Sequence, residues 1–439
     1  MNLRQPQLNT WHPWSVTLVA LFFAVFWISS SWNHHAKIPG NDWRSDLRVD
    51  GAGYYIYLPG MFHYGMRAKG LPLDLTERTA DGFIVHYARD RIITKYTCGV
   101  ALLELPFYLI AESIFGWGAT DGFTDTHRRA VEAGAILYWI IGLLLTALAL
   151  QRLLPAPPWV PVVLLPLIAF GSSLFYYAFR AADFSHVYSF AMVALALYLF
   201  VTRILDAEAV RPPSLFGFGI TCALIVLIRP TDAVIVLGFI AWIMAERPAL
   251  LRRPAFWGIM AFTALVVWSP QLAYWRFVHG RWLAVSYDNE AFTNLLSPHV
   301  LKFLFAAENG WLPYAPAMLL LPAGSFVLWK QRPHVVIILF AVLAFTVYLC
   351  SAWHMWNFGC GFGSRPLVQY LPLLAIPIWA WLRSPGPTAK LWRAALLPLL
   401  FLLVFVNYRL ALQYDGCFFG KDPWDWDYFG RGIAHAFLG

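Results

Sequence analysis

A few charged side chains stand out in a chain that is otherwise strongly apolar, and their types could transfer a group from a phosphate. Asp50 precedes a Gly-Ala-Gly-Tyr-Tyr run, and Asp183 follows Arg180 in a short turn. Arg229 lies directly before a proline, and Arg365 ends a glycine-rich stretch. A carboxylate can act as a general base toward a hydroxyl group. Cations can hold a departing phosphate through charge-assisted hydrogen bonds.

The composition shows what kind of protein has to position these side chains. Of 439 residues, 59% are hydrophobic and 13% are charged, and the mean hydropathy is +0.58. Soluble domains have about 25% charged residues, so a soluble globule, a disordered chain and a collagen are excluded. Five cysteines are too few for a disulfide scaffold. We therefore predict an all-α polytopic membrane protein. Cytoplasmic Lys and Arg explain much of the net charge of +8, so no nucleic-acid partner is predicted.

Charge-free intervals mark the membrane spans, each of which needs about 20 apolar residues. We predict about eleven transmembrane helices in a single domain, 1–439, with no internal repeat. Their approximate ranges are 14–31, 131–150, 159–179, 185–202, 214–228, 231–245, 255–275, 313–329, 334–351, 366–382 and 391–409.

Segment 98–116 is apolar but carries Glu104 and Glu112, with a proline between them. A charge at the bilayer centre costs about 2.5–3.5 kcal/mol on insertion scales, so we predict a juxtamembrane helix at the interface. The short basic loops then all lie on the side of the N-terminus, which the positive-inside rule makes the cytoplasm. The basic residues of these loops are Arg152, Arg203, Arg211, Arg247, Arg252, Arg253, Lys330, Arg332, Arg383, Lys390 and Arg393.

The opposite, extracytoplasmic face holds the longer loops and the C-terminus in this topology. These segments are the first loop 32–130 with its interfacial helices, the loops 276–312 and 352–365, and the tail 410–439. The first helix is too long for a cleaved signal and lacks an A-x-A site. We therefore predict a multi-pass membrane protein with a cytoplasmic N-terminus and an extracytoplasmic C-terminus.

The candidate charges all lie on this extracytoplasmic face, at the edge of the membrane. A phosphate bound at that position is expected to belong to a lipid. The backbone at Gly361 and Gly363 could present N–H groups to such an anion. Tyr54 and Tyr55 could stack on a sugar, or could belong to the aromatic belt that membrane proteins place at the interface.

These motifs, in this order, resemble the GT-C glycosyltransferases, which take a sugar from a polyprenyl-phosphate carrier at the membrane. The similarity is to the branch of the aminoarabinose transferases, the protein O-mannosyltransferases and related uncharacterised bacterial proteins. It is carried by the acidic residue after the first helix, the Arg-x-x-Asp turn at 180–183, the Arg-Pro-Thr tip at 229–231 and the glycine-rich loop that ends at Arg365. The run 95–99 matches less well, because relatives show Lys-Pro-Pro where this chain has Lys-Tyr-Thr.

The resemblance implies roles for individual residues. Asp50 corresponds to the catalytic base or acceptor-orienting residue, and Asp183 to the second acidic residue. Lys95, Arg229 and Arg365 correspond to the cations around the lipid phosphate. Arg180 and His186 are auxiliary candidates. The implied reaction transfers a sugar from a polyprenyl-phosphate donor to a hydroxyl of a glycan, lipid or protein acceptor, with inversion. No cofactor is firmly implied, and a divalent metal is left open.

Several of these residues also have purely structural explanations. Asp50 and Asp183 could cap the helices that follow them. Arg229 could extend its charged end from a helix terminus to the interface. His186 could be a hydrogen-bonded histidine of the core. Neighbouring glycines favour a ligand near Asp50, since they permit close approach of another group.

Histidines and cysteines give weaker indications. The histidines of the first loop lack the close spacing of a metal site, so no metal ligands are assigned. These histidines are His34, His35, His63 and His86. Cys360 and Cys417 both lie on the oxidising face and could form a disulfide, with Cys98 as a competing partner.

Two other classes of function compete with a transferase. A transporter or lipid flippase is favoured by the short helix pair 214–228 and 231–245 with Arg229 and Asp232 at its tip. Transporters, however, are usually built from repeats and place polar groups at the midplane. A non-catalytic subunit of a membrane complex would also explain the high aromatic content.

Overall fold

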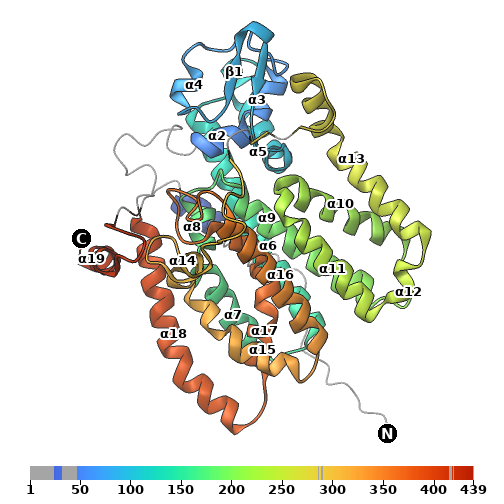
Figure 1. The fold of residues 1–439 in the computed structure, drawn as a ribbon, viewed down its shortest axis with the longest axis vertical. Helices are drawn as coiled ribbons and strands as arrows, with labels where there is room; N and C mark the ends of the chain where they lie inside the picture. Colours follow the sequence, from blue (N-terminus) through green and yellow to red (C-terminus); the bar gives the residue numbers. More distant parts are fainter. Residues whose placement is uncertain are drawn as a thin grey trace.

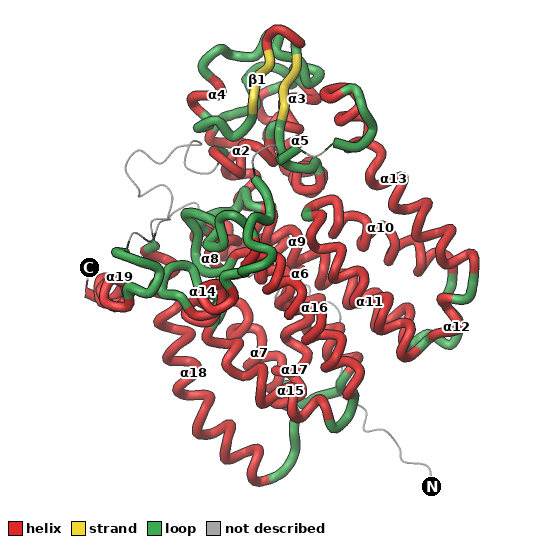
Figure 2. The backbone as a smooth tube through the Cα atoms, in the orientation of Figure 1, coloured by secondary structure: helices red, strands yellow, loops and turns green. Residues whose placement is uncertain are grey.

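The computed structural model describes residues 24–31, 47–284, 286–287, 290–414, 418 and 420–438. Long helices lie side by side in a bundle, and a layer of short helices and two strands covers one end of it (Figure 1). Colouring by secondary structure shows how little of the described chain is strand (Figure 2). The start of the predicted first span and residues 32–46 of the predicted first loop lie outside the described residues, while 24–31 are helical.

The bundle contains the segments that were predicted to span the membrane. Its helices are α6 (Asp125–Leu153), α7 (Trp159–Phe170), α8 (Leu174–Phe179), α9 (Ser185–Leu199) continued by η3 (Phe200–Leu205), α10 (Pro212–Ile228), α11 (Ala233–Glu246), α13 (Pro254–His279), α15 (Leu321–Trp329), α16 (Pro333–Ala352), α17 (Leu371–Arg383) and α18 (Pro387–Gln413). Shorter elements join them: η4 (Pro230–Asp232), α12 (Pro248–Leu251), α14 (Val300–Phe305), η5 (Leu312–Tyr314), η6 (Pro316–Leu320) and η7 (Arg365–Tyr370). Helix α19 (Trp426–Leu438) follows α18.

The layer at the end of the bundle, here called the end layer, comes from the predicted first loop. It contains α2 (Val49–Tyr55), α3 (Tyr57–Phe62), α4 (Leu75–Arg78), β1 (Ile84–His86), η2 (Tyr87–Arg89), β2 (Arg91–Ile93) and α5 (Gly99–Phe115). The two strands are antiparallel, with Ile84 opposite Ile93. The layer has its own cluster of buried apolar side chains, including Tyr55, Phe83 and Tyr108. That separate core gives it a fixed shape on which site residues can be held.

The bundle has the character of a membrane-spanning structure. Among the described residues, five helices are long and apolar enough to cross a membrane: α6, α9 with η3, α13, α16 and α18. Three further apolar helical segments are shorter: 159–170, 212–228 and 316–329. Large apolar side chains also remain on the outside of the bundle, such as Leu265 on α13 and Leu402 on α18. The chain is therefore a helical, multi-pass membrane protein.

The predicted helix 159–179 is broken in the structure, and contacts with α18 accommodate the break. The chain passes from α7 to α8 through residues 171–173. A side chain at Gly171 would collide with Val404 on α18. The backbone carbonyls freed at the break accept hydrogen bonds from the Asn407 side-chain amide, at 2.8 Å for Phe170 and 3.2 Å for Ser172. Irregular backbone at membrane depth is tolerated where protein supplies such partners.

Helix α5 occupies nearly the range predicted for the juxtamembrane segment, and it is not among the candidate spans of the described chain. It packs on α6, where Gly134 leaves room for the Phe107 ring. Both of its glutamates, Glu104 and Glu112, are buried against neighbouring elements, with 1% of each exposed. Its position at the interface stays a prediction.

The short basic loops meet at the end of the bundle opposite the end layer. Arg152 pairs with Asp206 at 2.6 Å, and Arg332 pairs with Glu246 at 2.9 Å. Arg247 donates to the backbone carbonyl of Leu205 at 3.1 Å. Loops that were predicted to share one side of the membrane are thus in contact with one another.

Cys360, in the glycine-rich loop, is disulfide-bonded. Cys98, the competing partner considered above, is a free and buried thiol. Cys417 lies outside the described residues.

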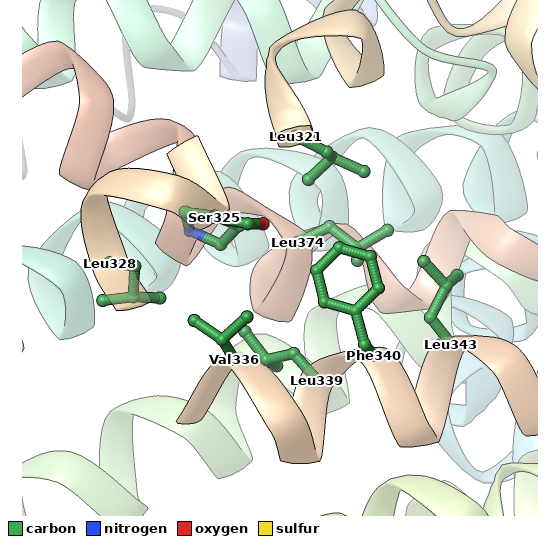
Figure 3. A pocket seen from close by; sticks show the side chains of 9 residues that line it. Leu321, Ser325, Leu328, Val336, Leu339, Phe340, Leu343 and Leu374 are labelled. Atoms are coloured by element: carbon green, nitrogen blue, oxygen red, sulfur yellow. The ribbon is translucent and has the colours of Figure 1, made fainter. Parts of the chain in front are cut away.

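A small void of about 10 Å³ lies between α15, α16 and α17. Apolar side chains line it, among them Leu321, Val336 and Phe340, and the Ser325 hydroxyl lies among them (Figure 3). Within the described chain that hydroxyl has no hydrogen-bond partner. Leaving a buried donor without a partner costs about 1–3 kcal/mol.

Replacing this serine should therefore stabilise the protein. We expect Ser325→Ala to raise the thermal unfolding temperature of the detergent-solubilised protein, because it removes the unpaired hydroxyl and creates only a slightly larger void. The matched control is Ser189→Ala, which removes a hydroxyl that donates to Asp232 at 3.0 Å and should lower the unfolding temperature. Equal losses in both variants would contradict the prediction.

Candidate functional site

The Asp50 carboxylate lies where the end layer meets the bundle. Asp50 is in the first turn of α2, whose N-cap is Arg48, so Asp50 does not cap this helix. One carboxylate oxygen accepts a hydrogen bond from Arg365 Nη2 at 3.1 Å, and the other accepts one from the Tyr96 hydroxyl. The side chains of Asp50 and Arg365 are 22% and 16% exposed. The carboxylate is thus oriented on both oxygens yet still accessible.

Tyr96 is a fixed donor in this arrangement. Burial, reinforced by the nearby Asp50 carboxylate, raises the pKa of Tyr96 well above its usual value. The phenol therefore stays protonated at physiological pH. Its ring packs against that of Tyr54, with centroids 4.1 Å apart and the ring planes tilted by 36°. Tyr96 belongs to the Lys-Tyr-Thr run, and the sequence alone had not marked it as a site residue.

Arg365 begins η7, directly before Pro366, and its guanidinium lies over the Phe184 ring at 5.1 Å from the centroid. The glycines before it allow close packing of the loop on the bundle. A side chain at Gly363 would collide with Tyr314 and Ser173, and Gly363 has a φ of +67°, which favours glycine. The neighbouring Phe362 N–H donates to the Tyr177 hydroxyl at 3.1 Å.

A carboxylate from α8–α9 lies beside α2. Asp183 is 2% exposed, and a Cβ built on Gly51 would stand 1.4 Å from its Oδ2 atom. The Asp183 carboxylate therefore occupies the space where a side chain at Gly51 would lie. Gly51 directly follows Asp50 in the chain. The N-cap of α9 is Phe184 rather than Asp183, so the capping explanation does not apply.

Arg229 reaches the same region from the break between α10 and η4. It is the C-cap of α10, where Pro230 ends the helical path. Its Nη1 donates to the Ser185 hydroxyl at 3.1 Å, and the Tyr54 hydroxyl lies 3.2 Å from the same oxygen. Arg229 Nε has no hydrogen-bond partner among the described residues. The guanidinium thus carries a buried N–H without a partner among these residues.

A buried network below Arg229 holds the break in place. Asp232, 1% exposed, accepts hydrogen bonds from Gln369 at 3.0 Å and from Tyr370 at 3.3 Å. These two residues belong to η7, which also begins with Arg365. The network therefore sets the positions of Arg229 and Arg365 relative to each other. Sequence reasoning had placed Asp232 with Arg229 at the hairpin tip but had not included it among the site residues.

Lys95 lies at the rim rather than at the centre of the site. It pairs with Glu290 at 2.5 Å, and its ammonium lies between the rings of Tyr96 and Tyr287, at 5.4 and 5.6 Å from their centroids. Both charged side chains are about one third exposed, at 35% and 33%. Glu290 and Tyr287 come from the loop after α13, and neither had been identified from the sequence.

The remaining candidates are placed around this centre. The His186 ring is buried below it, with Nδ1 at 3.5 Å from Gln369 Oε1. Arg180 donates to the backbone carbonyl of Tyr414 at 3.2 Å. Tyr55 points into the separate core of the end layer, where its hydroxyl donates to a carbonyl at 2.8 Å. Gly361 packs against the Tyr177 hydroxyl. Of the two tyrosines considered for stacking, only Tyr54 joins the site.

The geometry gives no further indication of a metal site. Within the described part of the chain, no group of three or more His, Cys, Asp and Glu side chains is arranged to hold a metal ion. Of the four histidines considered above, His34 and His35 lie outside the described residues. His63 contacts Glu112 instead, at 3.2 Å.

Comparisons with known proteins identify the fold. No family model and no curated sequence matches the chain. Among solved structures, it is similar to the archaeal oligosaccharyltransferase AglB from Archaeoglobus fulgidus, determined in complex with an inhibitory peptide and a dolichol-phosphate. The TM-score is 0.52 at 13% sequence identity, and the match covers 96% of this chain and 60% of AglB. The chain thus spans about three fifths of the length of AglB.

AglB is a glycosyltransferase of the GT-C fold, and the similarity extends over nearly the whole of this chain. The GT-C resemblance that the motifs indicated is therefore confirmed at the level of the fold. The predicted class of a helical membrane protein is confirmed as well, while the number of eleven spans stays a prediction.

The contact between Gly51 and Asp183 can be tested by adding one methyl group. We expect Gly51→Ala to displace the buried Asp183 carboxylate and to lower stability by about 1–3 kcal/mol, the usual cost of overpacking. The measurement is thermal unfolding of the purified protein. Asp183→Ala in the same chain should recover part of the loss, because it vacates the occupied space.

Gly258→Ala on α13 is the matched control for this substitution. A Cβ at Gly258 meets no atom within 4 Å, and alanine favours the helix. Its unfolding temperature should stay the same or rise. A Gly51→Ala protein as stable as this control would show that the two elements are not in contact.

Proposed function

We propose that the protein transfers a sugar from a polyprenyl-phosphate donor to a hydroxyl of an acceptor at the extracytoplasmic face of the membrane. The proposal rests mainly on the Asp50 carboxylate, which accepts hydrogen bonds from Tyr96 and Arg365. Arg229 lies at the same end of the apolar bundle. A base beside two cations at the membrane edge suits the replacement of a lipid phosphate by a hydroxyl oxygen.

The proposed reaction begins with the acceptor hydroxyl at Asp50. Asp50 takes the proton, and the hydroxyl oxygen forms a bond to the anomeric carbon of the donor sugar. The bond from that carbon to the phosphate oxygen breaks, and the lipid phosphate leaves with the electron pair. Attack opposite to the leaving group inverts the anomeric centre. Asp183, packed against α2 beside Asp50, orients the base or the acceptor.

Arg365 has two partners in this scheme. Without a substrate it pairs with Asp50 at 3.1 Å. As negative charge develops on the departing phosphate, the guanidinium can turn part of its hydrogen bonding toward it. The Arg229 guanidinium lies in the same region and adds positive charge beside the same phosphate, and Lys95 at the rim attracts the lipid headgroup. A phosphate held by several donors leaves more readily.

The proposed orientation rests on two features. The basic loops gather at the end of the bundle away from Asp50, as the positive-inside rule expects of the cytoplasmic end. The disulfide-bonded Cys360 lies in the loop that leads to Arg365, and disulfides persist in oxidising compartments. The site therefore faces away from the cytoplasm, in the bacterial inner membrane. AglB was determined with a dolichol-phosphate, which agrees with a lipid-phosphate donor here.

Removing the base should abolish transfer without unfolding the protein. We expect Asp50→Asn to lower the transfer rate by about 10²–10⁴-fold, because the amide keeps hydrogen-bond acceptance from Tyr96 but cannot take a proton. The assay follows labelled sugar transferred from synthetic polyprenyl-phosphate hexoses and pentoses in proteoliposomes. Asp427→Asn, an exposed residue of α19, is the control that should keep full activity. Full activity of Asp50→Asn would remove Asp50 from the mechanism.

The phosphate site can be tested without knowing the sugar. We expect Arg229→Met to weaken the binding of undecaprenyl phosphate by about tenfold or more, since a hydrogen bond from a charged donor contributes about 1.5–3 kcal/mol. Native mass spectrometry of the purified protein measures the fraction bound. Arg252→Met, at the opposite end of the bundle, should bind like the unchanged protein. Equal binding by both variants would exclude Arg229 from the phosphate site.

A further inference from the structure

A pocket of about 380 Å³ opens in the end layer, and none of the residues around Asp50 lines it. It lies between the end of α3 and the loop that joins α5 to α6. Its lining consists of Phe62, His63, Tyr64, Trp117, Gly118 and Thr120. Its volume is within the range of about 300–1,000 Å³ that is usual for small-molecule sites.

Two aromatic rings form an apolar wall of this pocket. Trp117 stands between Gly116 and Gly118, whose φ angles of +83° and +74° are those of glycine turns. This turn presents the indole ring outward, with 62% of the residue exposed. Phe62, 49% exposed, lies beside it, with ring centroids 5.7 Å apart at an angle of 50°. A ligand with a flat apolar face can pack against these rings.

Polar groups of fixed orientation line the same pocket. His63 contacts the buried Glu112 carboxylate at 3.2 Å. Glu112 also contacts His127 Nε2 at 2.9 Å, and the other ring nitrogen of His127 lies 2.8 Å from the Thr124 hydroxyl. This chain of contacts holds the His63 ring in place. The Thr120 hydroxyl oxygen accepts from Gly122 N–H at 3.2 Å, so its own O–H can donate to a ligand.

The carboxylates near the pocket are already engaged by protein groups. Glu112 lies between the two histidine rings, and Asp121 pairs with Arg78 at 2.8 Å. A charged ligand would find no unengaged opposite charge among these residues. The pocket therefore favours a neutral ligand with several hydroxyl groups and one apolar face. Sugars in the pyranose form have this combination.

We propose that this pocket binds a neutral sugar, a monosaccharide or disaccharide unit, through stacking on Trp117 and Phe62 and hydrogen bonds to His63 and Thr120. Helices α2 and α3 join Asp50 to His63 by a nearly continuous helical path of about 20 Å. If the proposed function is right, the pocket holds a distal sugar unit of a glycan acceptor, and the reacting hydroxyl of that acceptor lies at Asp50.

The experiment measures sugar binding directly, without catalysis. The full chain is placed in lipid nanodiscs, since maltoside detergents themselves carry sugars. Saturation-transfer NMR is recorded with methyl β-glucoside, methyl α-mannoside, methyl β-galactoside and cellobiose, and with glucuronate as a charged analogue. We expect transfer to the ring protons of at least one neutral sugar and at least fivefold less to glucuronate.

Substitutions of Trp117 test whether this signal comes from the pocket. Trp117→Ala should reduce the signal at least fivefold, and Trp117→Phe should retain most of it, because a ring remains. Trp257→Ala, which removes another exposed tryptophan on α13, should leave it unchanged. Because the readout is binding and not transfer, a failure of the proposed transferase activity is distinguishable from a failure of this inference. No signal with any neutral sugar, or an equal signal in Trp117→Ala, would overturn it.

Discussion

The ion pair between Asp50 and Arg365 joins two positions that are 315 residues apart, and most of the site depends on it. A charge at the edge of an apolar bundle is costly unless an opposite charge compensates it. Each of these two residues therefore requires the other, and the end layer has to sit on the bundle so that they meet. Gly51 makes the approach close enough, because its missing side chain leaves the space that the Asp183 carboxylate occupies.

Much of this arrangement follows from the sequence, because the apolar helices and the basic residues of the short loops obey simple rules. Intervals without charges gave nearly the observed ranges of α6, α9, α10, α11, α13, α16 and α18. Asp50, Arg229 and Arg365 stood out because a charge at a membrane edge is costly to keep without a function. The GT-C resemblance of their order agrees with the fold similarity to AglB.

Other parts of the site could not be predicted, since they depend on contacts between distant segments. Tyr96 is ordinary in the sequence, and only the fold brings its hydroxyl to Asp50. Glu290 pairs with Lys95 across 195 positions, in a loop that has no motif. The break between α7 and α8 was not predicted for a similar reason. Its unpaired backbone carbonyls accept hydrogen bonds from Asn407 of α18, which lies far along the chain.

That break has a mechanical consequence for the protein in its bilayer. Helix α18 has 27 residues, which makes it about 40 Å long, whereas the hydrocarbon layer is about 30 Å thick. Its charged residues near the two ends, Arg393 and Arg409, bound an apolar stretch that is shorter than the helix, so both ends can extend into the headgroup region. Because Asn407 fastens it to the α7–α8 break, and Ser173 at that break lies close to Gly363 in the loop before Arg365, α18 and the loop that carries Arg365 are mechanically linked.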